Sequence, residues 1–117
     1  MMMSLFQVAL GGAIGSVLRF MTVAAVGAPL GTLAVNVLGS FVMGIFFVAL
    51  PARTGLSPLL MTGVLGGFTT FSAFSLDAMK LWQAGQILPA LAYVGASLVL
   101  SLLAVAIGAA LAKGVLV

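Results

Sequence analysis

Polar side chains recur at helical spacing inside long apolar stretches of this sequence. Asn36 is followed four residues later by Ser40, and Tyr93, Ser97 and Ser101 repeat the same interval. Residues four apart lie on one face of an α-helix, so each set would present its polar groups in one direction. Such groups in an apolar helix either mark an ion or substrate pathway or join two helices through hydrogen bonds. The spacing alone is compatible with both interpretations.

The segment from Gly63 to Lys80, GVLGGFTTFSAFSLDAMK, is a poor helix interior. Its two adjacent glycines each cost about 1 kcal/mol relative to Ala, and the β-branched Thr69 and Thr70 follow them. A break here would free carbonyl groups at the end of one half-helix and N–H groups at the start of the next, with Thr69 or Thr70 as N-cap. The carbonyls would favour a cation and the N–H groups an anion. A kink in a continuous helix is the alternative.

Three phenylalanines, Phe68, Phe71 and Phe74, recur at intervals of three within this segment and are interleaved with hydroxyl groups. The edge of a phenyl ring is electropositive. Rings presented edge-on can therefore hold a small, partly dehydrated anion without a full positive charge. Packing against lipid or against a protein core is the alternative role.

The composition indicates a membrane protein. Of 117 residues, 64% are apolar and 4% are charged, against about 25% charged in a typical soluble domain. Mean hydropathy is +1.43. These values exclude a soluble enzyme, a nucleic-acid-binding protein and a disulfide-stapled secreted domain. The sequence has no Cys and no His, which removes the usual zinc sites and the Ser-His or Cys-His catalytic arrangements.

The sequence predicts an all-α integral membrane protein, a single four-helix transmembrane domain over residues 1–117 with a broken third helix. At about 20 residues a span, four helices use about 80 positions. Gly, Pro and charged residues divide the chain into spans at about 4–26, 30–50, 57–79 and 87–112. Because the connections are short, consecutive helices should be antiparallel neighbours.

The four cations are balanced between the two predicted membrane faces. Arg53 and Lys113 share the face of both termini, whereas Arg19 and Lys80 lie toward the other. Lys and Arg in the loops normally set the orientation of insertion. A balance of two against two predicts dual topology, in which an inverted pair of copies assembles, as inverted repeats do within larger transporters. A single orientation without bias is the alternative.

Three motifs resemble the Fluc/CrcB family of fluoride channels. They are GGAIGSVLRF at 11–20, GTLAVNVLGSFVMG at 31–44 and GGFTTFSAF at 66–74, and the resemblance extends over the whole chain. It implies a passive, fluoride-selective channel of the cell membrane that exports fluoride from the cytoplasm. It also implies an antiparallel homodimer with two pores, with no enzymatic activity, no nucleic-acid partner and no organic cofactor.

The resemblance further assigns roles to single residues. Asn36 would donate to fluoride in the pore, and the edges of Phe71 and Phe74 would line the pathway. The remaining pore positions would be Tyr93 and Ser97, with a polar track of Thr70, Ser72 and Ser75. Arg19 and Asp77 would lie in the vestibule, and the backbone carbonyls of Gly66 and Thr69 would hold a structural Na⁺ at the dimer interface. Ala73 replaces a Thr that is common in the family, so one hydroxyl of the track is missing.

Two other classes are compatible with four short spans. A proton-coupled small multidrug transporter needs a carboxylate embedded in the membrane, but the only carboxylate here, Asp77, is predicted near a helix end. A non-transporting assembly subunit would use glycine faces such as Gly11 and Gly15 for packing alone. Such a subunit would tolerate Asn36→Asp or Phe71→Ile without loss of an ionic phenotype.

Overall fold

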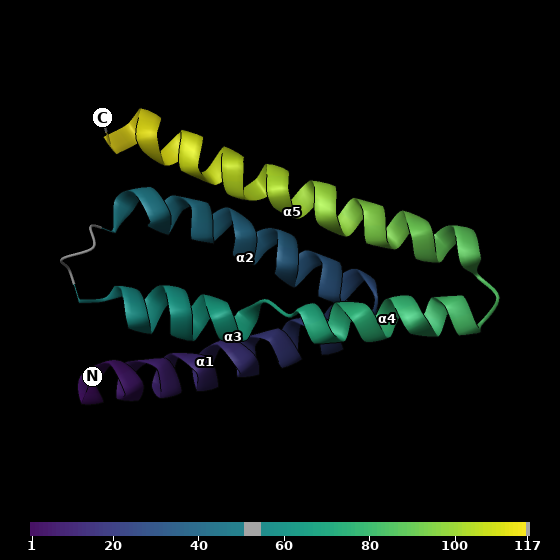
Figure 1. The fold of residues 1–117 in the computed structure, drawn as a ribbon, viewed down its shortest axis with the longest axis horizontal. Helices are drawn as coiled ribbons and strands as arrows, with labels where there is room; N and C mark the ends of the chain where they lie inside the picture. The colour runs from purple at the N-terminus through teal and green to yellow at the C-terminus, as the bar shows by residue number, and fades with distance from the viewer. Residues whose placement is uncertain (51–54, 117) are drawn as a thin grey trace.

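The computed structural model describes residues 1–50 and 55–116, in which all regular structure is helical. Figure 1 shows the helices lying side by side along one long direction, with both termini at the same end. In chain order they are α1 (Met2–Val26), α2 (Leu30–Ala49), the π-helical η1 (Pro58–Leu65), α3 (Gly66–Phe68), α4 (Phe71–Gln83) and α5 (Ile87–Leu116).

Four stretches are long and apolar enough to cross a membrane, which confirms the predicted number of spans. They are Met2–Val26, Leu30–Ala49, Pro58–Gln83 and Ile87–Val115. The third continues past Lys80, where the sequence had suggested an end, because a cation in the last turn of a helix stabilises its carbonyl terminus. The prediction of one domain over the whole chain stays a prediction.

The described residues between the spans include glycines in the left-handed region. Gly27, Gly55 and Gly85 have φ of 91°, 73° and 81°, a conformation that costs glycine nothing because it has no Cβ. The turns make consecutive spans antiparallel (Figure 1). Arg53, one of the four cations in the charge balance, lies outside the described residues.

Glycines allow two pairs of helices to pack at backbone distance. A Cβ on Gly44 of α2 would collide with the carbonyl oxygen of Val105, and one on Gly108 of α5 with that of Phe41. Gly15 of α1 meets the carbonyl oxygen of Val64 in the same way. Helices that lack a hydrophobic driving force in lipid associate through such close contacts. The packing fixes α2 against α5 and α1 against η1, and it leaves the polar faces of α2 and α5 beside α4.

Candidate functional site

The helix is interrupted between α3 and α4. Thr69 (φ −81°, ψ 153°) and Thr70 (φ −150°, ψ 123°) are extended. The Thr70 hydroxyl accepts a hydrogen bond from the N–H of Ala73 at 3.1 Å, so Thr70 is the N-cap of α4, one of the two positions that the sequence suggested. The Thr69 hydroxyl donates instead to the carbonyl oxygen of Leu65, at 2.9 Å.

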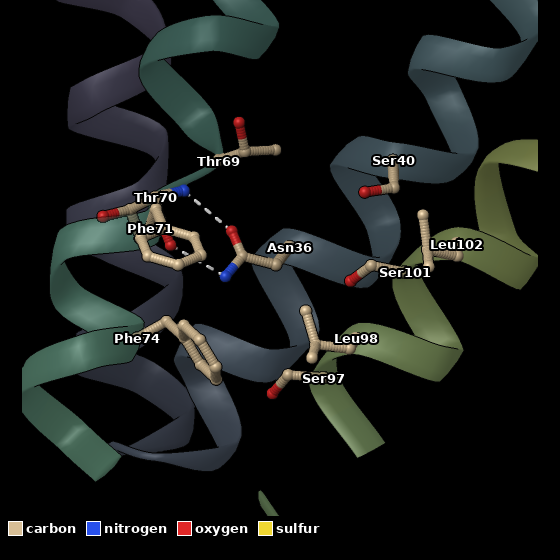
Figure 2. A pocket seen from close by; sticks show the side chains of 10 residues that line it. All are labelled: Asn36, Ser40, Thr69, Thr70, Phe71, Phe74, Ser97, Leu98, Ser101 and Leu102. Atoms are coloured by element: carbon tan, nitrogen blue, oxygen red, sulfur yellow. Dashed lines mark hydrogen bonds between the residues drawn. The ribbon is translucent and has the colours of Figure 1, made fainter. Parts of the chain in front are cut away.

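Asn36 of α2 bonds to the backbone of this interruption. Its Oδ1 accepts from the N–H of Thr70 at 2.7 Å, and its Nδ2 donates to the Thr70 carbonyl oxygen at 2.9 Å. Figure 2 shows both bonds, with the amide of Asn36 facing the start of α4. Asn36, the residue expected to donate to fluoride, is therefore held by the N–H and the carbonyl of Thr70.

A cavity of about 280 Å³ lies where α2, the interruption and α5 meet. Figure 2 shows the side chains around it. None of its lining residues is charged; they are Asn36, Ser40, Thr69, Thr70, Phe71, Phe74, Ser97, Leu98, Ser101 and Leu102. A second cavity of about 220 Å³ shares Ser40, Thr69, Ser101 and Leu102, and extends the polar region toward Met43 and Val105.

Ser97 is the unsatisfied group of this cavity. Its side chain is only 5% exposed, and its hydroxyl has no hydrogen-bond partner among the described residues. Buried hydroxyl groups in proteins are normally bonded, so an orphan of this kind calls for an explanation. A bound polar or anionic species in the cavity supplies one.

The two predicted phenylalanines both line the cavity but differ in burial. Phe71 is 73% exposed and Phe74 only 8%, and their rings meet edge to face with centroids 5.4 Å apart. The Phe74 ring also contacts the ring of Tyr93, at 5.3 Å between centroids. Phe71 thus lies at the margin of the protein and Phe74 in its interior.

Asp77 and Tyr93 lie beside the cavity and do not line it. Oδ2 of Asp77 accepts from the Thr32 hydroxyl at 2.7 Å and from the Tyr93 hydroxyl at 3.4 Å. All three side chains are buried. No ion pair joins Arg19 to Asp77 within residues 1–50 and 55–116. The carboxylate of Asp77 is instead turned inward to the two hydroxyl groups.

The other predicted positions lie outside the lining of the cavity. Ser72 Oγ lies 3.4 Å from the Thr70 hydroxyl, and Ser75 Oγ donates back to the carbonyl oxygen of Phe71 at 2.9 Å. Gly66 is exposed just before the interruption, and Arg19 is half-buried on α1. The hydroxyls of the predicted polar track therefore already take part in local hydrogen bonds.

Sequence reasoning missed some residues of the site. Thr32 had a signal, since it precedes Asn36 by four residues and extends the polar face of α2. Ser40 and Ser101 were recognised in their patterns but given no role. Leu98 and Leu102 had no signal, because a leucine that lines a cavity is indistinguishable in sequence from one that faces lipid.

The chain is similar to known proteins over nearly its whole length. The family model described as CrcB-like protein, Camphor Resistance (CrcB), matches residues 6–109. A protein of Paracoccus denitrificans (strain Pd 1222) named fluoride-specific ion channel FluC is 52% identical over 115 residues, 92% of this chain and 93% of the relative. A protein of the same name from Chelativorans sp. (strain BNC1) is 50% identical, over 98% of this chain and 100% of the relative. A third, from Hahella chejuensis (strain KCTC 2396), is 49% identical over 96% of each chain.

Proposed function

Since this chain belongs to the CrcB family, we propose that it is a fluoride-selective passive ion channel that exports fluoride from the cytoplasm. Its four apolar helices make it a multi-pass membrane protein, and the relatives are named as fluoride-specific channels. The observation that carries the proposal is the uncharged cavity into which the buried Ser97 can donate its hydroxyl, which has no partner among the described residues.

The cavity has the chemistry to replace part of the hydration shell of fluoride. The second N–H of Asn36 and the hydroxyls of Ser97 and Ser101 are donors, and phenyl ring edges add weak positive potential. Among the described residues, no lysine or arginine lines the cavity. Conduction requires binding that is favourable and yet weak enough for the ion to leave, and neutral donors meet both requirements.

A second copy in inverted orientation completes the proposed channel. Ser72 and Ser75 are exposed on a membrane-spanning helix, and Phe71, which lines the cavity, is 73% exposed. Polar groups facing hydrocarbon are unfavourable unless protein or water covers them. An antiparallel partner would cover this face and close each cavity into a pore, and the balanced cations permit both orientations of insertion.

The interruption between α3 and α4 suits a structural Na⁺ at the interface. In a continuous helix the carbonyls of Gly66 and Thr69 would accept from the N–H groups of Thr70 and Ala73. Those N–H groups bond instead to Asn36 and to the Thr70 hydroxyl. Unwound carbonyl groups are the oxygen ligands that bind Na⁺ in broken membrane helices. The residues therefore fit the ion, which when bound would join the two copies through their carbonyls.

Arg19 and Asp77 complete the proposed pathway at one end of the helices. A half-buried cation on α1 raises the local concentration of anions, as charged vestibules do. Asp77 acts there through Tyr93 and Thr32, whose hydroxyls it holds.

The proton-coupled transporter is disfavoured by the same hydrogen bonds. The chain has one carboxylate, and that carboxylate is outside the cavity and bonded to Thr32 and Tyr93. A drug-binding carboxylate must be accessible to its cation and to protons. The function is therefore passive transport, without enzymatic catalysis.

The deciding experiment is fluoride efflux from liposomes that contain the purified protein, with valinomycin and K⁺ to clamp the voltage and a fluoride electrode as detector. We expect rapid release of fluoride and none of chloride from a parallel chloride-loaded preparation. No fluoride release from well-incorporated protein would refute the channel, and uptake of organic cations would then be tested. Equal release of both anions would refute selectivity.

A further inference from the structure

The pair formed by Asn36 and the backbone of Thr70 has a role beyond donation to an ion. Thr70 is extended (φ −150°, ψ 123°), so its N–H is excluded from the helical hydrogen-bond ladder on either side. Its carbonyl oxygen is an acceptor that also needs a partner. An unpaired N–H at membrane depth would be strongly unfavourable.

Asn36 satisfies both groups at once. Oδ1 accepts from the Thr70 N–H at 2.7 Å, and Nδ2 donates to the Thr70 carbonyl oxygen at 2.9 Å. The planar amide thus binds Thr70 as a neighbouring strand would. Because the two bonds run in opposite directions, a flipped amide would place donor against donor and acceptor against acceptor. The backbone of Thr70 fixes which atom of the amide lies where.

We propose that Asn36 is a positioning residue whose pair with Thr70 keeps the interruption extended and leaves only an amide N–H, and no amide oxygen, for the cavity. Oδ1 is occupied by the Thr70 N–H, and one of the two hydrogens on Nδ2 is used. Asn36 lines the cavity, so the remaining hydrogen is what the amide offers to an anion there. A released amide could turn its oxygen into the cavity and repel the anion.

The same pair also determines where α4 begins. Thr70 is held by Asn36 through its backbone, while its hydroxyl accepts the N–H of Ala73. Residues that start a helix set the direction of its first turn. Asn36 therefore acts through Thr70 on the positions of Phe71 and Phe74, both of which line the cavity.

The test removes the Thr70 N–H and leaves every side chain in place. An ester linkage at Thr70, introduced as the α-hydroxy acid, deletes the donor to Oδ1 of Asn36. A matched ester at Leu91, an exposed residue of α5, deletes an ordinary helical bond. This expectation rests on the proposed function: fluoride flux should be about tenfold lower with the Thr70 ester than with the Leu91 ester. A tenfold change in rate corresponds to the free energy of about one hydrogen bond. Equal flux would overturn the positioning role and leave the fluoride channel standing.

A second readout does not depend on transport. Hydrogen exchange at the isotope-labelled Thr70 amide should be at least about tenfold faster in Asn36→Ala than in the unchanged chain, because a lost hydrogen bond exposes that amide. Asn36→Asp should keep the amide protected, since a carboxylate oxygen still accepts from it, yet lose fluoride flux. Ser40→Ala, one turn further along α2, should leave Thr70 exchange unchanged. Equal exchange in Asn36→Ala and Ser40→Ala would overturn the proposal even if an ester variant failed to insert. Absence of fluoride flux in the unchanged chain would refute only the proposed function.

Discussion

The hydroxyl of Thr32 donates to the buried carboxylate of Asp77 at 2.7 Å, and joins α2 to α4 between residues 45 apart in the chain. Thr32 is 1% exposed and Asp77 8%. A buried carboxylate depends on the donors around it, because burying a charge without a partner is costly. The bond also holds the second half of the third span against the helix that carries Asn36.

Thr32→Val should destabilise the fold. The substitution keeps the shape of the side chain and removes the donor to a charged group, which costs about 1.5–3 kcal/mol. Unfolding in a denaturing detergent titration, followed by the fluorescence of Trp82, the chain's only tryptophan, measures the change. Thr22→Val is the matched control, since the Thr22 hydroxyl donates to the Leu18 carbonyl of its own helix, and it should change stability by less than about 0.5 kcal/mol. Similar effects of the two variants would contradict this account of Thr32.

Tyr93→Phe should be milder than Thr32→Val. The Tyr93 hydroxyl lies 3.4 Å from Asp77 Oδ2, a long distance for a hydrogen bond between oxygens. The ring contact with Phe74 survives the substitution. We expect a loss below about 1 kcal/mol in the same titration. A loss larger than that of Thr32→Val would show that Tyr93, and not Thr32, is the main donor to the carboxylate.

Substitution by Ala should have opposite effects on stability at two glycines of the bundle, one at the contact of α2 with α5 and one away from it. In Gly44→Ala the new Cβ would meet the backbone of Val105 and lie 2.9 Å from the N atom of Ala109. Backbone cannot move aside cheaply, so we expect a loss of about 1–3 kcal/mol. Gly95→Ala meets nothing within 4 Å, and it should stabilise α5 by about 0.5–1 kcal/mol. The detergent titration distinguishes them, and a stable Gly44→Ala would mean that the two helices pack less closely than described.

The sequence was sufficient for the number of spans, and it limited the N-cap of α4 to Thr69 or Thr70, of which the structure uses Thr70. Long apolar runs are dictated by the thickness of the bilayer, and Thr is favoured at an N-cap because its hydroxyl accepts from a backbone N–H of the first turn. Both signals are local, so one stretch of sequence contains all that is needed to interpret them.

The partners of the polar groups could not be predicted in the same way. Asn36 bonds to the backbone of Thr70, and backbone groups have no signature in the sequence. Thr32 and Asp77 meet because the register of α2 against α4 brings them together, and register depends on the packing of the whole bundle. The polar faces were visible in the spacing, but their assignment to a cavity or to a helix contact required the fold.

Ser97→Ala should separate stability from transport. The Ser97 hydroxyl is buried and has no partner among the described residues, so its removal relieves an unsatisfied polar group and should leave stability equal or up to about 1 kcal/mol higher. If the hydroxyl serves a passing anion, fluoride flux should nevertheless fall about five- to tenfold, which corresponds to roughly 1–1.4 kcal/mol.

Ser75→Ala provides the comparison for Ser97→Ala, since the Ser75 hydroxyl donates back to the Phe71 carbonyl and lies outside the cavity lining. A smaller loss of flux is expected there, because a hydroxyl bonded to its own helix has less to offer an ion. Flux and stability are to be measured on the same preparations, by the liposome assay and the detergent titration. If Ser97→Ala unfolded more easily than the unchanged chain, the hydroxyl would have a structural partner; if its flux were unchanged, the cavity beside Asn36 would not be the path of the ion.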